Sequence, residues 1–436
     1  MTSLNIAGAS AGEIARSIEA AVQNGALGAD ATLPPIRELA RTLKVSPVTV
    51  TAAYRLLRTR GLVAGHGRRG TRLQPRATVT ARVHRLPPNA VDLASGNPDP
   101  ALLPVLAHAL RTVPSEPTLY GDPLQLRPLM TFAASEFQAD GIPAEALVVT
   151  SGALDAIERI LREHLRHGDR VAVEDPGFAP LFDLLRASGF TLEPFHVDDE
   201  GPEPESFERA MQRAQAVVVT PRAQNPTGAA LTASRAEALT RIVHARPDVV
   251  VIENDPFSAL AHERGTFLSD GSRRHWAVVR STAKFLGPDL RVAVVSGDQA
   301  TIARVQRRQS LGPRWVSHVL QHLALALWSD PAAGRQLARA AEIYALRRTA
   351  LLTELRSHGI GAHGRSGINV WIPVVDETAT VQALADCGWA VAAGERFRIR
   401  AAPGIRVTTS ALEPSESGRF ARDLASLARP PAAAFA

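Results

Sequence analysis

STAKFLGPDLRVA, residues 281–293, contains Lys284, one of only two lysines in a chain of 436 residues that otherwise uses arginine for its cationic side chains. A serine stands three residues before this lysine and an arginine seven residues after it. Arginine cannot replace lysine where an amine must react with an aldehyde, because the guanidinium stays charged and is a poor nucleophile. The alternative is a chance surface lysine. The retained Lys284 favours a covalent role.

The lysine follows the last of five apolar runs rich in Val and Ile, which alternate with helical stretches. Such runs predict the strands of a mostly parallel sheet that is buried on both faces. Functional residues of these sheets lie just beyond the carboxyl ends of the strands. The runs are ALVVTSG (146–152), RVAVEDP (170–176), AVVVTPR (216–222), DVVVIENDP (248–256) and WAVVRSTAK (276–284).

The residues at the strand ends suit one cofactor. Gly152 and Ala153 open a helix whose free N–H groups would bind a phosphate. Phe178 offers an aromatic plate, Asn225 a polar group, and Lys284 an amine. Pyridoxal 5′-phosphate (PLP) needs an amine for its aldehyde, N–H groups and an arginine for its phosphate, and stacking and in-plane hydrogen bonds for its ring. The pattern therefore predicts a PLP site.

The net charge of +6 is confined to the N-terminal region. Residues 1–76 contain eleven Lys and Arg against four Asp and Glu, whereas the remainder contains 38 against 39. Arginine enrichment by base composition would affect the whole chain equally. The asymmetry favours an N-terminal module that binds a polyanion.

That module has the pattern of a winged helix-turn-helix. Apolar spacing predicts helices within 11–27, 33–45 and 46–63, followed by a hairpin with a glycine-rich, basic tip. Ser46 is a good N-cap, and Pro47 suits the first helical position. The stretch LPPIRELARTLKVSPVTVTAAYRLLRTRGL, residues 33–62, resembles the GntR family of bacterial repressors. Pro47 replaces an arginine frequent in that family, so base preference is not inherited.

By this resemblance, the N-terminal module binds double-stranded operator DNA. The alternative for a winged helix is a role in protein contacts alone. The implied groove-facing or phosphate-facing residues are Arg37, Ser46, Thr49 and Thr51, and those of the wing tip are His66, Arg68 and Arg69.

The order of motifs after residue 90 resembles the class I and II aminotransferases, a PLP-dependent transferase fold of type I. With the GntR-like start, the whole chain resembles a MocR-type regulator. The resemblance implies an internal aldimine on Lys284, a homodimer, and an arginine, Arg406, for an amino acid's carboxylate. It further implies phosphate binding by Ser281, Arg291, Gly152, Ala153 and the partner-reaching Tyr120, and ring contacts by Phe178 and Asn225.

The catalytic pattern departs from the enzymes at ENDPF, residues 253–257. The resembling enzymes have an aspartate at the place of Asn254, where it pairs with the pyridine nitrogen, and a tyrosine at the place of Phe257. Asparagine supplies no negative charge to keep that nitrogen protonated. A shift of one residue would give the role to Asp255, so both alternatives stay open. A second departure, YGDPLQLRPLM, lacks a glycine before its Leu-Arg pair.

We expect an α/β protein with a winged helix-turn-helix at 1–76, a linker at 77–104 and an aminotransferase-like domain at 105–430, whose smaller α+β subdomain covers about 325–430. A single cysteine, Cys387, and the absence of a signal or membrane-spanning pattern indicate a cytoplasmic protein without a multi-cysteine metal site. The leading hypothesis is a PLP-responsive regulator that senses PLP alone or with an amino acid or amine. The alternatives are an active aminotransferase or lyase with an appended DNA-binding module, and a PLP carrier that binds no DNA.

Overall fold

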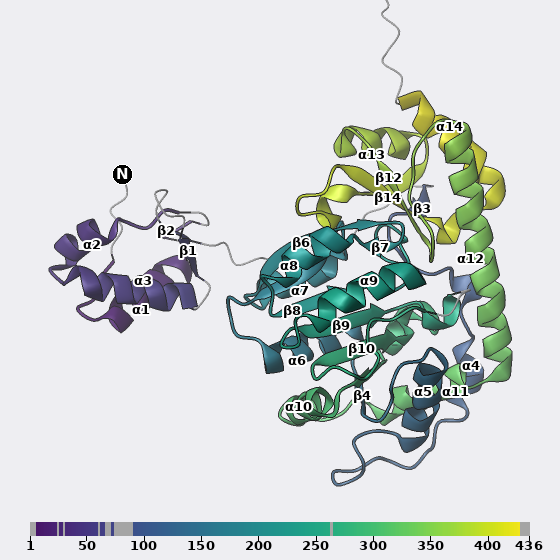
Figure 1. Cartoon of the computed structure of the whole chain (residues 1–436), viewed down its shortest axis with the longest axis horizontal. Coiled ribbons are helices and arrows are strands. Elements are labelled where there is room, and N and C mark those ends of the chain that lie inside the picture. Colours follow the sequence, from purple (N-terminus) through teal and green to yellow (C-terminus); the bar gives the residue numbers. More distant parts are fainter. Residues whose placement is uncertain are drawn as a thin grey trace, which may run out of the picture. The chain divides into compact units, whose positions relative to one another are not determined.

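The computed structural model describes residues 6–23, 26–28, 31–59, 62–65, 71–73, 90–261 and 265–427. Residue contacts divide the chain into an N-terminal unit and a larger unit that contains most of residues 90–427. Figure 1 shows the elements of both units along the chain. Each unit is described by itself.

The N-terminal unit is a winged helix-turn-helix, as predicted. Ile14, Ile18, Val50, Ala53 and Leu57 are fully buried in its core, so the predicted apolar stripes face one another. The wing strands pair antiparallel, and the second strand also bonds to the segment before α2. The elements are α1 (Ala11–Gln23), α2 (Ile36–Leu43), α3 (Pro47–Thr59), β1 (Val63–Gly65) and β2 (Thr71–Leu73).

The larger unit is built on a sheet of eight described strands in the order β4-β11-β10-β9-β8-β5-β6-β7. The five predicted runs form β4, β5, β8, β9 and β10, and the last four of these pair parallel in the order β5-β8-β9-β10. Strand β11 runs antiparallel between β10 and β4. The strands are β4 (Leu147–Thr150), β5 (Arg170–Asp175), β6 (Thr191–Asp198), β7 (Gly201–Pro202), β8 (Ala216–Val219), β9 (Val250–Asp255), β10 (Trp276–Ser281) and β11 (Ala293–Gly297).

Helices cover the sheet and bury it in separate apolar clusters. Helices α5 and α11 share one cluster with β10 and β11, while α8 and α9 share another with β5, β8 and β9. This burial on both sides explains why the strand sequences are continuous apolar runs rich in Val and Ile. The helices are α4 (Leu106–Leu110), α5 (Arg127–Ala139), α6 (Ala153–His164), α7 (Ala179–Ala187), α8 (Pro204–Met211), α9 (Ala233–His244), α10 (Gln299–Ser310) and α11 (His318–Trp328).

A second, smaller sheet lies in the C-terminal part, in the strand order β12-β14-β13-β3. Helix α12, the long green helix of Figure 1, contacts both α11 of the large part and α14 of the small part. The elements are β3 (Val91–Leu93), α12 (Pro331–Ser357), β12 (Asn369–Pro373), α13 (Glu377–Asp386), β13 (Trp389–Ala393), β14 (Gly404–Thr408) and α14 (Ser417–Leu427).

The predicted linker, residues 77–104, needs a correction. Strand β3 lies inside this range and pairs parallel with β13, so residues 90–104 belong to the larger unit and the boundary at 105 is too late. A strand of three residues shows no periodicity in sequence, because its position is set by the strand it joins. Residues 77–89 lie outside the described residues.

Candidate functional site

Lys284 lies in a 3-10 turn, Thr282–Lys284, directly after β10. Its Nζ donates a hydrogen bond to the carbonyl oxygen of Gly96 at 2.5 Å. Burial, with a smaller effect of the positive charge of Arg406, lowers the pKa of Lys284 to about 8. Because the neutral amine is the nucleophile, about a tenth of Lys284 is ready to react at pH 7, far more than for a lysine of ordinary pKa.

Arg406 reaches the same place from β14 of the small sheet. It donates hydrogen bonds to the carbonyl oxygen of Ala94 and to Oδ1 of Asn225, and its guanidinium lies over the ring of Phe397 at 4.8 Å. Burial lowers its pKa to about 10. No carboxylate of the described residues forms an ion pair with it. This buried cation can therefore receive an anionic group of a ligand.

A cradle for an anion lies at the ends of three neighbouring strands. The register places Thr150 of β4 beside Ala293 of β11, and Ala293 beside Ser281 of β10. Gly152 caps α6 with a φ of +95°, and a Cβ there would meet Nη2 of Arg291 at 2.8 Å. The place thus combines a helix N-terminus, the hydroxyl of Ser281 and the guanidinium of Arg291, which a side chain at position 152 would displace. These are groups that a phosphate needs.

Asn254 and Asp255 lie on opposite faces of β9, because neighbouring residues of a strand alternate. Asn254 pairs with Val279 of β10, which shares its face with Ser281. The Asn254 side chain is 6% exposed, and its Oδ1 is buried without a hydrogen-bond partner. An unpartnered buried polar atom indicates a position at which a ligand group can bond. The geometry thus favours Asn254 over Asp255 for the ring nitrogen.

Asp255 is occupied in a buried network on the other face of the sheet. Its carboxylate accepts hydrogen bonds from Arg222 and Arg280, and Asp140 accepts from the same two arginines. These partners hold the pKa of Asp255 low in spite of its burial. The structure therefore corrects the inclusion of Asp255 among the cofactor-binding residues. Sequence reasoning missed this network, since the pairing of Arg280 with Asp255 depends on strand register.

The aromatic candidates have different surroundings. Phe178 is half-buried at the start of α7, where its carbonyl oxygen accepts from Leu181. Phe257 is buried in the core and lines a cavity that Lys284 does not line. Tyr120 is 80% exposed and packs edge-on against Trp315 at 5.6 Å. The described contacts thus do not bring Tyr120 to the site of its own chain.

Three of the DNA-binding candidates that the structure describes, Ser46, Thr49 and Thr51, lie at the start of α3. Ser46 Oγ accepts from the Thr49 N–H and is hydrogen-bonded to the Thr49 hydroxyl, and Thr51 donates to the Pro47 carbonyl. Arg37 is exposed on α2. Val48, which sequence reasoning missed, is 77% exposed beside them. His66, Arg68 and Arg69 lie outside the described residues.

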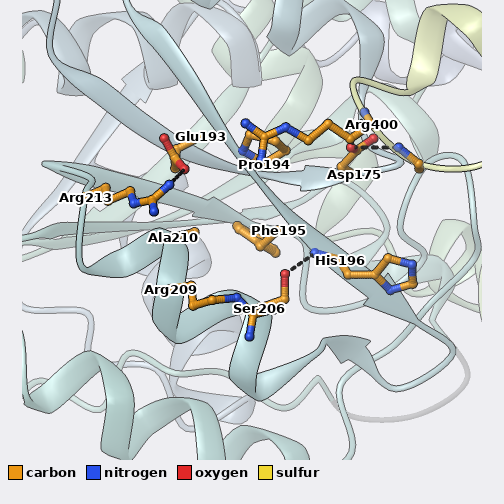
Figure 2. A pocket seen from close by; sticks show the side chains of 11 residues that line it. Asp175, Glu193, Pro194, Phe195, His196, Ser206, Arg209, Ala210, Arg213 and Arg400 are labelled. Carbon is orange, nitrogen blue, oxygen red and sulfur yellow. Dashed lines mark hydrogen bonds and ion pairs between the residues drawn. The ribbon is translucent and has the colours of Figure 1, made fainter.

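A cavity of about 350 Å³ lies at another part of the sheet (Figure 2). Asp175 accepts there from the N–H groups of Ile399, Arg400 and Ala401, and Glu193 accepts from Arg213 at 3.2 Å. Both carboxylates are therefore satisfied within the protein, which indicates that they join segments rather than bind a ligand. In the described ranges, no three His, Cys, Asp or Glu side chains gather as metal ligands, and no helix has the length and apolarity needed to cross a membrane.

Comparisons with known families match both parts of the chain. Residues 88–424 match the family "Aminotransferase class I and II", and residues 10–73 match "Bacterial regulatory proteins, gntR family". The vitamin B6 salvage pathway transcriptional repressor PtsJ of Salmonella typhimurium is 42% identical over 96% of this chain and 98% of its own length. The uncharacterized HTH-type transcriptional regulator YdcR of Escherichia coli is 25% identical over 91% of this chain and 92% of its own.

Solved structures share the fold of the larger unit. The kynurenine aminotransferase of Pyrococcus horikoshii superposes with a TM-score of 0.70 at 20% identity, over 78% of this chain and 90% of its own. At that identity, the likeness supports the fold alone. The large mixed sheet and the small sheet are accordingly those of a fold-type I aminotransferase.

Proposed function

Because this chain belongs to the aminotransferase class I and II family and is a GntR-family transcriptional regulator of the MocR type, we propose that it binds PLP at Lys284 and that PLP binding changes its affinity for operator DNA. The observation that carries the proposal is Lys284 itself, a desolvated amine beside an anion cradle. The relative named as a vitamin B6 salvage repressor supports a response to this vitamin. We accordingly propose a cytoplasmic location, where operator DNA is accessible.

The residues of the site fit PLP group by group. Bound PLP supplies an aldehyde, which reacts with a neutral amine, and a ring that withdraws electrons. Lys284 provides the amine, and Gly96 orients it through the 2.5 Å hydrogen bond. Ser281, Arg291 and the start of α6 at Gly152 and Ala153 would bind the phosphate. Phe178, Asn225 and Asn254 would contact the ring.

Arg406 suits the carboxylate of an amino acid effector. Its guanidinium bonds to Asn225, and Asp92 acts on it as a negative charge but forms no ion pair with it. A ligand carboxylate would supply the direct ion pair that the described residues do not. Its position on the small sheet, opposite Lys284 on the large one, would let such a ligand bridge the two sheets of the larger unit. An amino acid bound with PLP is therefore the natural second signal.

The N-terminal unit provides the DNA contacts in this proposal. Arg37, Ser46, Thr49 and Thr51 would contact bases or phosphates of the major groove, and His66, Arg68 and Arg69 those of the minor groove. The exposed Val48 suits the methyl group of a thymine. The net charge of +7 over residues 1–76 would make the binding strongly dependent on salt.

We expect the purified protein to retard a fragment of its own upstream region, with an affinity that changes when PLP is added. Arg37→Ala should weaken this binding by about 10- to 100-fold, the range of a lost groove contact. Arg16→Ala, which removes the same charge from an exposed position of α1, should change it little. The measurement is an electrophoretic mobility shift with and without PLP. Absence of any retardation in both conditions would contradict the proposal.

We also propose a homodimer, formed through an exposed apolar surface of Leu119, Tyr120, Leu124, Leu311 and Val319. Leu311 is 77% exposed, and the contact of Tyr120 with Trp315 brings the segments 119–124 and 311–319 together. Apolar side chains gathered on a surface mark interaction sites. In a dimer of this kind, Tyr120 would reach the phosphate of the partner's site rather than its own.

Leu311→Asp is expected to weaken the dimer by at least about 100-fold, because the new carboxylate would be buried without a partner. Val375→Asp is the matched control, since Val375 is 99% exposed on the loop after β12. Sedimentation equilibrium over a range of concentrations measures the effect. A parent protein that sediments as a monomer, or a Leu311→Asp protein that dimerises as the parent does, would refute this surface.

A second candidate function is an active aminotransferase or lyase with an appended DNA-binding module. Lys284 with a pKa of about 8 and the open charge of Arg406 favour it. Asn254 and Phe257, in place of an aspartate and a tyrosine, weigh against it, as does the relative that is a repressor. We therefore propose that the chain is not an efficient enzyme.

A further inference from the structure

A second cavity of the larger unit, of about 310 Å³, is separate from the Lys284 site. Neither Lys284 nor Asn225 nor Arg406 lines it. Its walls are one face of α12, the loop after β8, the turn after β9 and the segment before β12. The volume lies at the lower end of the range of small-molecule sites, about 300–1,000 Å³.

Arg348 is the charged group that faces this cavity from α12. It follows Ala341, Tyr344 and Ala345 at helical spacing, and all four line the cavity. Its Nη1 donates to the carbonyl oxygen of Gly367 at 2.6 Å, and no carboxylate in the described part of the chain pairs with it. Burial, without a compensating negative charge, lowers the pKa of Arg348.

The neighbouring arginine of the same helix, in contrast, has ion-pair partners. Arg347 pairs with Asp99 at 2.8 Å and with Glu413 at 2.5 Å, so its charge is neutralised within the fold. A half-buried arginine without such partners costs desolvation energy that a bound anion would offset. The difference between Arg347 and Arg348 points to a ligand at the latter.

The remaining lining defines the shape of that ligand. Leu231, Phe257 and Leu260 form apolar walls. Two further guanidiniums line the cavity: that of Arg222, which is paired with Asp140 and Asp255, and that of the exposed Arg365. We propose that this cavity binds a small organic anion, a carboxylate or a phosphate ester on an apolar body, with its charged group on Arg348. A neutral molecule of the same shape would leave the arginine unpaired and would bind poorly.

Two segments that line the cavity also carry residues of the Lys284 site. Pro221 lies on the loop that carries Asn225, and Phe257 follows β9, which carries Asn254. The Ser366 N–H donates to the carbonyl oxygen of Gly228 at 2.7 Å, which ties the third wall to the same loop. An anion that shifts these walls would change the PLP site, so the cavity is an effector site. Only this coupling rests on the proposed function; anion binding does not.

Calorimetric titration of the full chain, loaded with PLP and freed of excess PLP so that the phosphate-binding groups beside Lys284 are occupied, tests the site with phenylacetate, phenyl phosphate and the neutral phenylacetamide. We expect one of the two anions to bind and the amide not to bind, and the tighter anion identifies carboxylate or phosphate as the preferred group. Arg348→Gln should weaken binding by at least about 10-fold, the value of a charge-assisted hydrogen bond. Arg356→Gln, an exposed position of the same helix, should not weaken it.

Ala345→Leu provides a second test if Arg348→Gln does not fold, because it fills the cavity without removing a charge. Absence of anion binding by the parent, or unchanged binding by either Arg348→Gln or Ala345→Leu, would overturn the site. Saturating anion should shift the PLP dissociation constant by at least about fivefold, and no shift would overturn the coupling. A parent that binds the anion but not PLP would refute the proposed function and leave the anion site intact.

Discussion

Lys284→Ala is expected to abolish covalent retention of PLP. The parent, treated with PLP and then with borohydride, should gain one cofactor per chain by mass spectrometry, on the peptide that contains residue 284. The alanine protein should carry no label on that peptide, because no other side chain of the site offers an amine. Lys284→Arg should fail as well, since a guanidinium does not react with the aldehyde. A Lys284→Ala protein labelled as fully as the parent would contradict the assignment.

The chain contains its own control for this experiment. Lys44, the only other lysine, is exposed at the end of α2, so Lys44→Ala should leave the labelling unchanged. The pH dependence adds a second criterion. Because the pKa of Lys284 is lowered to about 8, the neutral amine increases as pH rises through that value. The rate of PLP attachment should therefore rise from pH 6 to about 8 and level off above it.

The regulatory role gives Lys284→Ala a further readout. If the protein senses PLP through this amine, the alanine protein should bind its upstream DNA with one affinity, whether or not PLP is present. The N-terminal unit has its own buried core, so its DNA contacts should survive the substitution. A variant that still responds to PLP as the parent does would show that sensing does not pass through Lys284.

Much of the fold could be predicted from the sequence, because local signals coincide with the elements formed. The runs of Val and Ile became parallel strands, and Ser46 caps α3 through its hydrogen bond to Thr49. Lys284 and Ser281 could be placed at one strand end because Ser281 is the last residue of β10 and Lys284 follows three residues later. Features of this kind need no knowledge of distant contacts.

What depends on pairing between distant segments could not be predicted. Strand β3 is recognisable only through β13, and the antiparallel β11 only through its neighbours. The lack of an ion-pair partner for Arg348 among the described residues has no local signal either, because its sequence neighbour Arg347 is neutralised by residues far along the chain. Solvent exposure and charge pairing are properties of the folded chain, so they require the structure.

The ambiguity between Asn254 and Asp255 belongs to the same class. Alternation along β9 shows that only one of the two can face Ser281, but sequence does not say which. The hydrogen bonds of Asp255 to Arg222 and Arg280 resolve the ambiguity in favour of Asn254. This result supports the proposed place of Asn254 beside the ring nitrogen and leads to the next prediction.

Asn254→Asp is expected to increase amino-group transfer from amino acids to PLP by about 10- to 1,000-fold. A carboxylate beside the ring nitrogen keeps it protonated, and the resulting positive charge stabilises the carbanion that transfer requires. Each tenfold gain corresponds to about 1.4 kcal/mol of transition-state stabilisation. The measurement is the rate of 2-oxo acid release in single-turnover mixing of the PLP-bound protein with a panel of amino acids.

The same substitution should destabilise the protein without PLP. Position 254 is 6% exposed, and Oδ1 of Asn254 has no hydrogen-bond partner among the described residues, so a carboxylate there would be buried without compensation until the ring binds. Thermal unfolding should therefore shift down in the free protein and recover with PLP. Asp255→Asn is the matched control, since it removes a carboxylate from the opposite face of β9. It should cost about 3–5 kcal/mol of stability by leaving Arg222 and Arg280 short of a partner, with no gain in transfer. If Asp255→Asn speeds amino-group transfer and Asn254→Asp does not, the assignment of Asn254 to the ring nitrogen is wrong.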